Sequence, residues 1–128
     1  MKKLLLTLFL IPNFVIGENQ LDNKGIMCKS GYFNNNKELN LWCIKNKCAE
    51  YTIYGYKVIK RDTWKASYWG STRINFVNST GSQLNLDRES LKLEGYKTPT
   101  YSCEVALKES DIIDYLYEKI NKSKKENK

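Results

Sequence analysis

Residues 39–54, LNLWCIKNKCAEYTIY, contain two apolar-rich runs on either side of a polar Lys45-Asn46 pair. Two short runs of strand-forming residues around a two-residue turn are typical of a β-hairpin. With this pair at the centre of the turn, Cys43 lies opposite Cys48 in a non-hydrogen-bonded pair, whose short Cα separation suits a disulfide. The stretch therefore predicts an antiparallel hairpin that is closed by its own disulfide.

Short alternating segments of the same kind occur along the rest of the chain. Clusters of Asn, Ser, Gly and Asp separate them at intervals of about ten residues, the spacing expected of an all-β domain. Gly55 interrupts one segment and indicates a bulge or bend. The fold prediction is a mainly β protein, a small antiparallel barrel or strongly curved sheet of about seven to eight strands. The predicted strands are residues 25–33, 39–44, 48–60, 64–69, 72–77, 84–86, 91–93 and 101–107, with turns at residues 34–37, 45–46, 78–82 and 87–90.

The apolar residues change their period near the C-terminus. They recur at helical spacing at Ile112, Ile113, Leu116 and Ile120. Acidic residues in the first turn of this segment favour the helix dipole. The pattern predicts one C-terminal α-helix that packs its apolar side on the sheet or on the barrel mouth, and then frays into a Lys-rich tail at residues 119–128.

Residues 1–17 have the layout of a secretory signal peptide. Met1-Lys2-Lys3 precede an almost uninterrupted apolar run that is too short to span a membrane, and Gly17 offers a cleavage point. We therefore expect a bacterial protein that is periplasmic or secreted and has no transmembrane segment. The predicted organisation is a signal peptide at 1–17, a flexible lead-in at 18–24, a single β-rich domain with its C-terminal helix at 25–118 and the Lys-rich tail at 119–128.

The four cysteines are expected to form two disulfides, because an exported chain meets an oxidising compartment. Once Cys43 is paired with Cys48, Cys28 and Cys103 pair by elimination, and this second bond ties the first strand to the last. The chain has no C-x-x-C motif and no His that could complete a zinc site. Neither a metal nor a cofactor is predicted.

The formal charge of +7 is unevenly distributed along the chain. Lys2 and Lys3 leave with the signal peptide, which lowers the charge to +5, and residues 119–128 carry +4 of it. A basic surface spread over the fold is therefore not predicted, and a nucleic-acid ligand is not expected, because Arg, the residue of bidentate base contacts, is scarce. The tail is predicted to give only a weak, screened attraction to anionic surfaces.

The absence of His removes the commonest general base and the Ser-His-Asp triad. Glycoside hydrolysis by two carboxylates needs only acidic side chains. The acids available for it lie at predicted turns or alternate with apolar residues on a strand, the pattern of a solvated face: Asp62, Asp87, Glu89, Glu94 and Glu104. The sequence therefore predicts that the protein is not an enzyme, with a small carboxylate-based hydrolase as an alternative.

Aromatic residues gather between positions 51 and 69. By strand alternation, Trp64 and Tyr68 share one face and Trp69 lies on the other. Two interpretations stay open for these side chains. They fill the ends of a small barrel, or they are exposed and stack on a sugar or enter a partner's pocket. Trp64, Tyr68 and Trp69 are thus candidate binding residues for an unknown protein or glycan ligand.

The C-terminal half resembles a pattern of small, uncharacterised exported bacterial proteins in three segments: INF (74–76), LNLDRESLKL (84–93) and YSCEV (101–105). More distantly, it resembles the periplasmic inhibitors of C-type lysozyme. That resemblance implies a small antiparallel barrel whose early and late strands are joined by a disulfide. The inhibitory S-G-x-x-Y loop has no counterpart here, because SGY at 30–32 has a different spacing and lies in a predicted strand. No functional residue carries over.

The function prediction follows from export, the disulfides and the aromatic cluster. We expect a monomeric, non-catalytic exported binding protein of unknown ligand. The two alternatives to this binding protein are a structural envelope protein without a defined ligand and the small carboxylate-based hydrolase.

Overall fold

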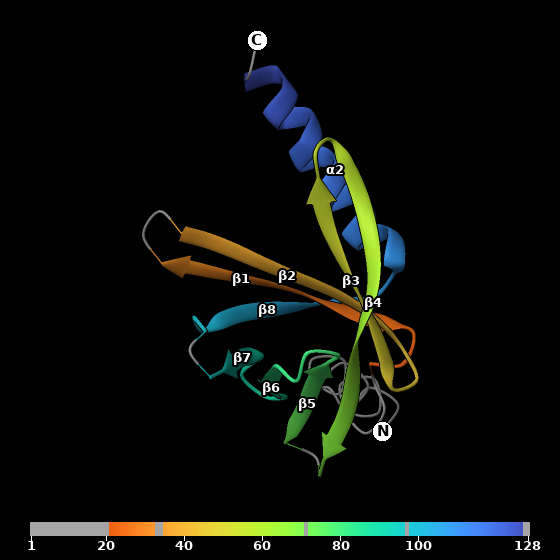
Figure 1. Cartoon of the computed structure of the whole chain (residues 1–128), viewed down its shortest axis with the longest axis vertical. Helices are drawn as coiled ribbons and strands as arrows, with labels where there is room; N and C mark the ends of the chain where they lie inside the picture. The colour runs from red at the N-terminus through yellow and green to blue at the C-terminus, as the bar shows by residue number, and fades with distance from the viewer. Residues whose placement is uncertain (1–20, 33–34, 71, 97, 127–128) are drawn as a thin grey trace, which may run out of the picture.

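The computed structural model describes residues 21–32, 35–70, 72–96 and 98–126 (Figure 1). The predicted signal peptide, residues 1–17, and the first residues of the lead-in lie outside this part. Eight strands and one helix are present in the described residues: β1 (Lys24–Tyr32), β2 (Asn35–Ile44), β3 (Lys47–Tyr54), β4 (Lys57–Trp69), β5 (Arg73–Asn78), β6 (Gln83–Asp87), β7 (Lys92–Gly95), β8 (Tyr101–Ala106) and α2 (Glu109–Glu126).

The strands form a closed antiparallel barrel, which confirms the predicted fold class. Each strand pairs with the next one along the chain, and β8 pairs back with β1 to close the sheet. The inward side chains follow the two-residue alternation of the sequence. On β5, for example, Ile74 and Phe76 face Leu86 and Leu84 of β6, and all four side chains are buried. This inner face forms the larger of two hydrophobic cores.

A second core lies on the outer face of the barrel, where α2 packs across β1, β2, β3, β4 and β8. Ile112 and Leu116 of the helix contact Trp42 and Ala106 on the strands. Gly25 permits this close approach, because a Cβ atom there would lie 2.9 Å from Cδ1 of Ile112. The helix therefore covers a sheet face and not the barrel mouth.

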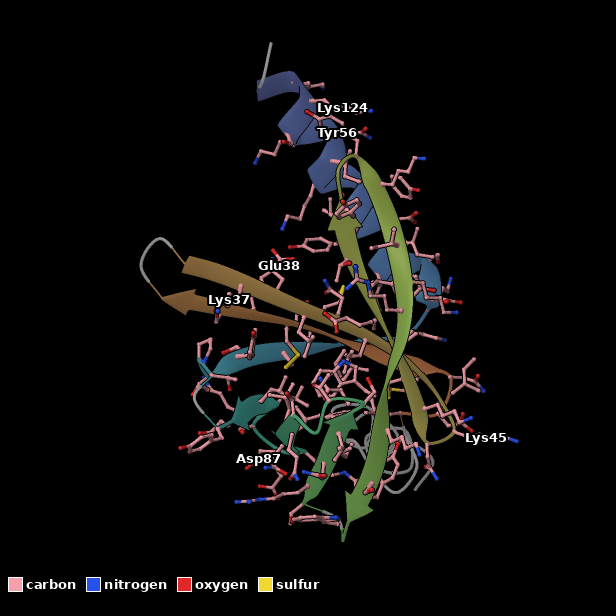
Figure 2. All side chains as sticks on the ribbon, in the orientation of Figure 1. Lys37, Glu38, Lys45, Tyr56, Asp87 and Lys124 are labelled. Carbon is pink, nitrogen blue, oxygen red and sulfur yellow. A yellow bond between two sulfur atoms is a disulfide. The ribbon has the colours of Figure 1, made fainter. Side chains whose placement is uncertain are left out.

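The helix also runs further than the sequence predicted. It continues to Glu126, and Ile120 is only 3% exposed, so the domain does not end at residue 118 and the described part of the tail is helical. Lys, which makes up five of the ten tail residues, is a good helix former. Near the end of α2, Lys124 lies over the ring of Tyr56 at 5.2 Å, which places the helix beside the β3–β4 turn (Figure 2).

Polar contacts attach α2 to the β1–β2 hairpin. The hydroxyl of Tyr115 donates a hydrogen bond to Oε2 of Glu38 (2.9 Å), and Nζ of Lys119 lies 2.6 Å from the same oxygen. Nζ of Lys29 lies 4.8 Å from the centre of the Tyr115 ring. The pKa of Lys29 is raised, mainly by a hydrogen bond with Tyr115. The helix is thus held by charge as well as by apolar packing.

Several boundaries differ from the sequence predictions, and three of them change which residues are buried or paired. Leu21 is fully buried and the amide of Asn23 donates to the carbonyl of Cys43, so the expected flexible lead-in packs against the barrel from residue 21 onward. The predicted turn at 34–37 is shorter, because β2 begins at Asn35. Leu107, the last residue of the predicted final strand, is 66% exposed because β8 ends one residue earlier.

Gly55 is neither a bulge nor a bend within one strand. It adopts φ +65 in a two-residue hairpin turn that reverses the chain, with Ile53 paired to Val58. Beyond this turn, β4 continues without interruption to Trp69 and absorbs two segments that were predicted separately. A register shift next to Cys48 accommodates its length.

Both predicted disulfides are present, and no described cysteine is free. Cys28 and Cys103 are direct partners in the β1–β8 register, 75 residues apart in sequence, while Cys43 and Cys48 are direct partners across the β2–β3 hairpin. Two such bonds indicate a protein that works outside the cytoplasm. Within the described part of the chain, no helix has the length and apolar character needed to cross a membrane.

Arg88 is an unusual core residue, because its side chain is fully buried. Nη1 donates a hydrogen bond to the carbonyl of Gly70 (2.7 Å), and the guanidinium lies 5.5 Å from the ring centre of Tyr68. Nε and Nη2 have no hydrogen-bond partner among the described residues. The guanidinium therefore links the β4–β5 connection to the turn after β6, at a cost in desolvation.

Candidate functional site

The structure separates the three candidate aromatic residues. Trp64 is 8% exposed and belongs to the inner core, where its Nε1 donates to Oε1 of Glu50 (3.0 Å). Tyr68 is half-buried and packs against the same core, and burial raises its pKa. Trp69 lies on the opposite face and is 56% exposed. The predicted alternation holds, but these residues do not form one binding platform.

A groove of about 1000 Å³ lies beside the β2–β3 turn, lined by outward-facing residues such as Trp42 and also by Cys48 and Trp64 of the inner core. We call it the hairpin groove. It spans β2 to β5, because Trp42 faces Ala49 across β2–β3 and Lys65 faces Val77 across β4–β5. Its lining includes the apolar residues Trp42, Ile44, Ala49, Trp64 and Val77 and the basic residues Lys45, Lys47, Lys60 and Lys65.

Local structure explains why the groove has a defined shape. The Cys43–Cys48 disulfide closes the hairpin beneath it, and the amide of Lys45 donates to Oδ1 of Asp22 (2.6 Å) at the turn. The carbonyl of Asn46 accepts a hydrogen bond from the amide of Ala66 on β4. The register shift between Cys48 and Ala49 bends the sheet at this point. Figure 2 shows Lys45 extending outward from the tip of the hairpin.

Positive charge dominates the hairpin groove. Lys47 and Lys65 are direct cross-strand partners and both are exposed. Lys60 forms an ion pair with Glu109 at 3.6 Å. Of the ion pairs within 4.0 Å that the described side chains make, none involves Lys45, Lys47 or Lys65.

A second cavity, of about 870 Å³, lies beside β5, β6 and β7. Its lining includes Glu50, Asp87 and Glu94 together with Trp64 and Tyr101. The pKa of Asp87 is lowered, because its carboxylate accepts hydrogen bonds from the amides of Ser90 and Glu89. A general acid needs a carboxyl group whose pKa is raised. The shift at Asp87 is therefore in the direction opposite to that role.

The other acids of the hydrolase alternative are dispersed. Glu89 and Glu104 are exposed and do not line either cavity, and nothing is described for the side chain of Asp62. In the described residues, no cluster of His, Cys, Asp or Glu could hold a metal ion. No protein-family model, no curated protein and no solved structure matches this chain.

Sequence reasoning missed the lysines of the hairpin groove. It assigned the positive charge to the tail and treated the folded body as nearly neutral, because it summed charges along the chain. Lys47 and Lys65 are eighteen positions apart in sequence and meet only through the β3–β4 register. The available signal was the short Lys-Asn-Lys turn at 45–47, which carries no acid.

Proposed function

We propose that the protein is a small, non-catalytic binding protein that acts in the periplasm or after secretion, and that the hairpin groove is its binding surface. The observation that carries this proposal is a groove of about 1000 Å³ with buried Trp42 and Ala49 on its floor and charged groups on its rim. Such a combination of apolar floor and few polar groups is typical of ligand sites. The disulfide beneath the groove favours binding, because a preorganised surface loses little entropy when its ligand arrives.

Ile44 favours a binding role over that of a structural envelope protein. Its aliphatic side chain is 50% exposed at the rim of the groove, although it follows directly after a buried strand segment. An apolar side chain that lines a concave groove together with buried apolar residues is typical of a ligand site. The lowered pKa of Asp87 in the second cavity does not support the carboxylate-hydrolase alternative, because a general acid needs a raised pKa.

Photo-cross-linking tests this proposal directly. A photoreactive amino acid at position 44 should capture a protein or glycan in the cells that produce the chain. The same amino acid at position 107, where Leu107 is also exposed but does not line the groove, is the matched control. A discrete adduct from position 44 alone is expected. Equal adducts from both positions, or none from position 44, would refute the groove as the binding surface.

A further inference from the structure

We infer that the hairpin groove binds an acidic polypeptide segment that also carries apolar side chains. This inference rests on the proposed function, because it names the ligand class of the same groove. Its evidence is the charge pattern of the rim, the contacts of one carboxylate beside it and the shape of the floor.

The charge pattern is costly for an isolated protein. Like charges directly opposite one another on neighbouring strands destabilise a sheet, and Lys47 and Lys65 stand in this relation. Lys45 lies two positions before Lys47 at the same rim. Acids also lie near this stretch: Asp62 stands opposite Ala49 by register, the carboxylate of Asp22 accepts a hydrogen bond from the amide of Lys45, and Glu109 pairs with Lys60. Of the ion pairs that the described side chains make, none involves Lys47 or Lys65. An anionic ligand would offset the repulsion that the fold leaves in place.

The protein itself shows a carboxylate at the edge of the groove. Glu109, the first residue of α2, accepts a hydrogen bond from the hydroxyl of Tyr51 and pairs with Nζ of Lys60. Lys60 is also a lining residue of the groove. This side of the groove therefore already binds a carboxylate that is supplied by a polypeptide.

The shape of the groove favours a chain over a flat anionic surface. Four neighbouring strands, β2 to β5, span about 15 Å, which an extended segment of roughly five residues would cross. The groove is concave, with a volume of about 1000 Å³, so a planar membrane surface would contact the exposed lysines but would not fill it. A segment that combines acidic and apolar residues matches both the exposed lysines and the apolar lining residues of the groove.

Titration calorimetry with a short peptide of alternating Glu and Leu tests the inference, and a peptide of alternating Lys and Leu is the comparison. The full-length mature protein should bind the acidic peptide and not the basic one. The double variant Lys47→Gln/Lys65→Gln should weaken binding about tenfold, because it removes two exposed ion pairs. The matched control Lys122→Gln/Lys125→Gln makes the same charge change on exposed residues of α2 and should leave the affinity unchanged.

Each alternative result has a defined meaning. Equal weakening by both double variants would show attraction by net charge only and overturn the inference. Binding to vesicles that contain anionic lipid, reduced by the groove variant while the acidic peptide does not bind, would overturn it in favour of a membrane surface. A specific adduct from position 44 whose yield does not change in Lys47→Gln/Lys65→Gln would overturn the charge assignment and leave the proposed function standing. Urea unfolding of both variants should show no loss of stability, since the groove variant removes a repulsive pair.

Discussion

Removal of the long disulfide should destabilise the protein far more than removal of the short one. In the chain-entropy account, closing a loop of 75 residues stabilises the native state by about 4.5 kcal/mol, and closing one of 5 residues by about 2 kcal/mol. Cys28→Ala/Cys103→Ala should therefore cost about 2.5 kcal/mol more than Cys43→Ala/Cys48→Ala. All four side chains are at most 9% exposed, so the packing lost with the sulfur atoms is similar in the two variants and largely cancels in the comparison.

The assay is equilibrium urea unfolding of the chain without its predicted signal peptide and of both double variants, followed by tryptophan fluorescence. For a domain of this size, the predicted gap corresponds to a difference of roughly 10–20 °C in Tm. Equal slopes against urea would show that the variants unfold from comparable native states. If the hairpin variant loses as much stability as the barrel-closing variant, loop length does not set the contribution of these bonds and the reasoning fails.

Three further predictions concern single elements. Arg88→Met should leave the free energy of unfolding within about 1 kcal/mol of the original or raise it, because a buried charge is exchanged for an apolar side chain of similar size. A loss above about 3 kcal/mol would show that the contacts of the guanidinium fully offset its desolvation cost, against this prediction. Truncation after Asn121 removes the exposed residues 122–125 of α2 together with the residues that follow them, and it should cost less than about 1 kcal/mol. A truncation that also removes the buried Ile120 should cost about 2 kcal/mol or more, as measured by thermal unfolding. The pKa of Asp87 is lowered in the folded state, so its contribution to stability is present above the unfolded pKa and is lost as the pH falls below about 4. Asp87→Asn should therefore flatten the acid side of the curve of unfolding free energy against pH. An unchanged curve would contradict this prediction.

The features that could be predicted from sequence are those set by local pattern. The turn at 45–46 and its flanking cysteines define a hairpin without reference to the rest of the chain. Strand alternation placed Trp64 and Tyr68 on one face and Trp69 on the other, as the structure confirms. The long disulfide followed once the short one was assigned.

The features that could not be predicted either lack a local turn signal or depend on residues far apart in sequence. Gly55 lacks the Asn-Gly or Asp-Gly signal of a tight turn, and alternation on both sides of it fits a single bent strand equally well. Arg88 follows an acidic turn residue and was expected at a solvated corner, while its burial depends on the β4–β5 connection. The lysines of the hairpin groove come together only through the β3–β4 register, in which Lys47 stands opposite Lys65.

The order of pairing in this barrel has a consequence for how it folds. Seven of the eight strand pairings join consecutive strands, which form as local hairpins, and only β1 with β8 requires the two ends of the sheet to meet. Until they meet, both strands are open edges that can pair with another chain and aggregate. The Cys28–Cys103 bond lies at that last junction, so its oxidation locks closure once it has occurred. A chain that meets an oxidant only after export would then have its barrel sealed in the compartment where it acts, and open-edged molecules would accumulate only where oxidation fails.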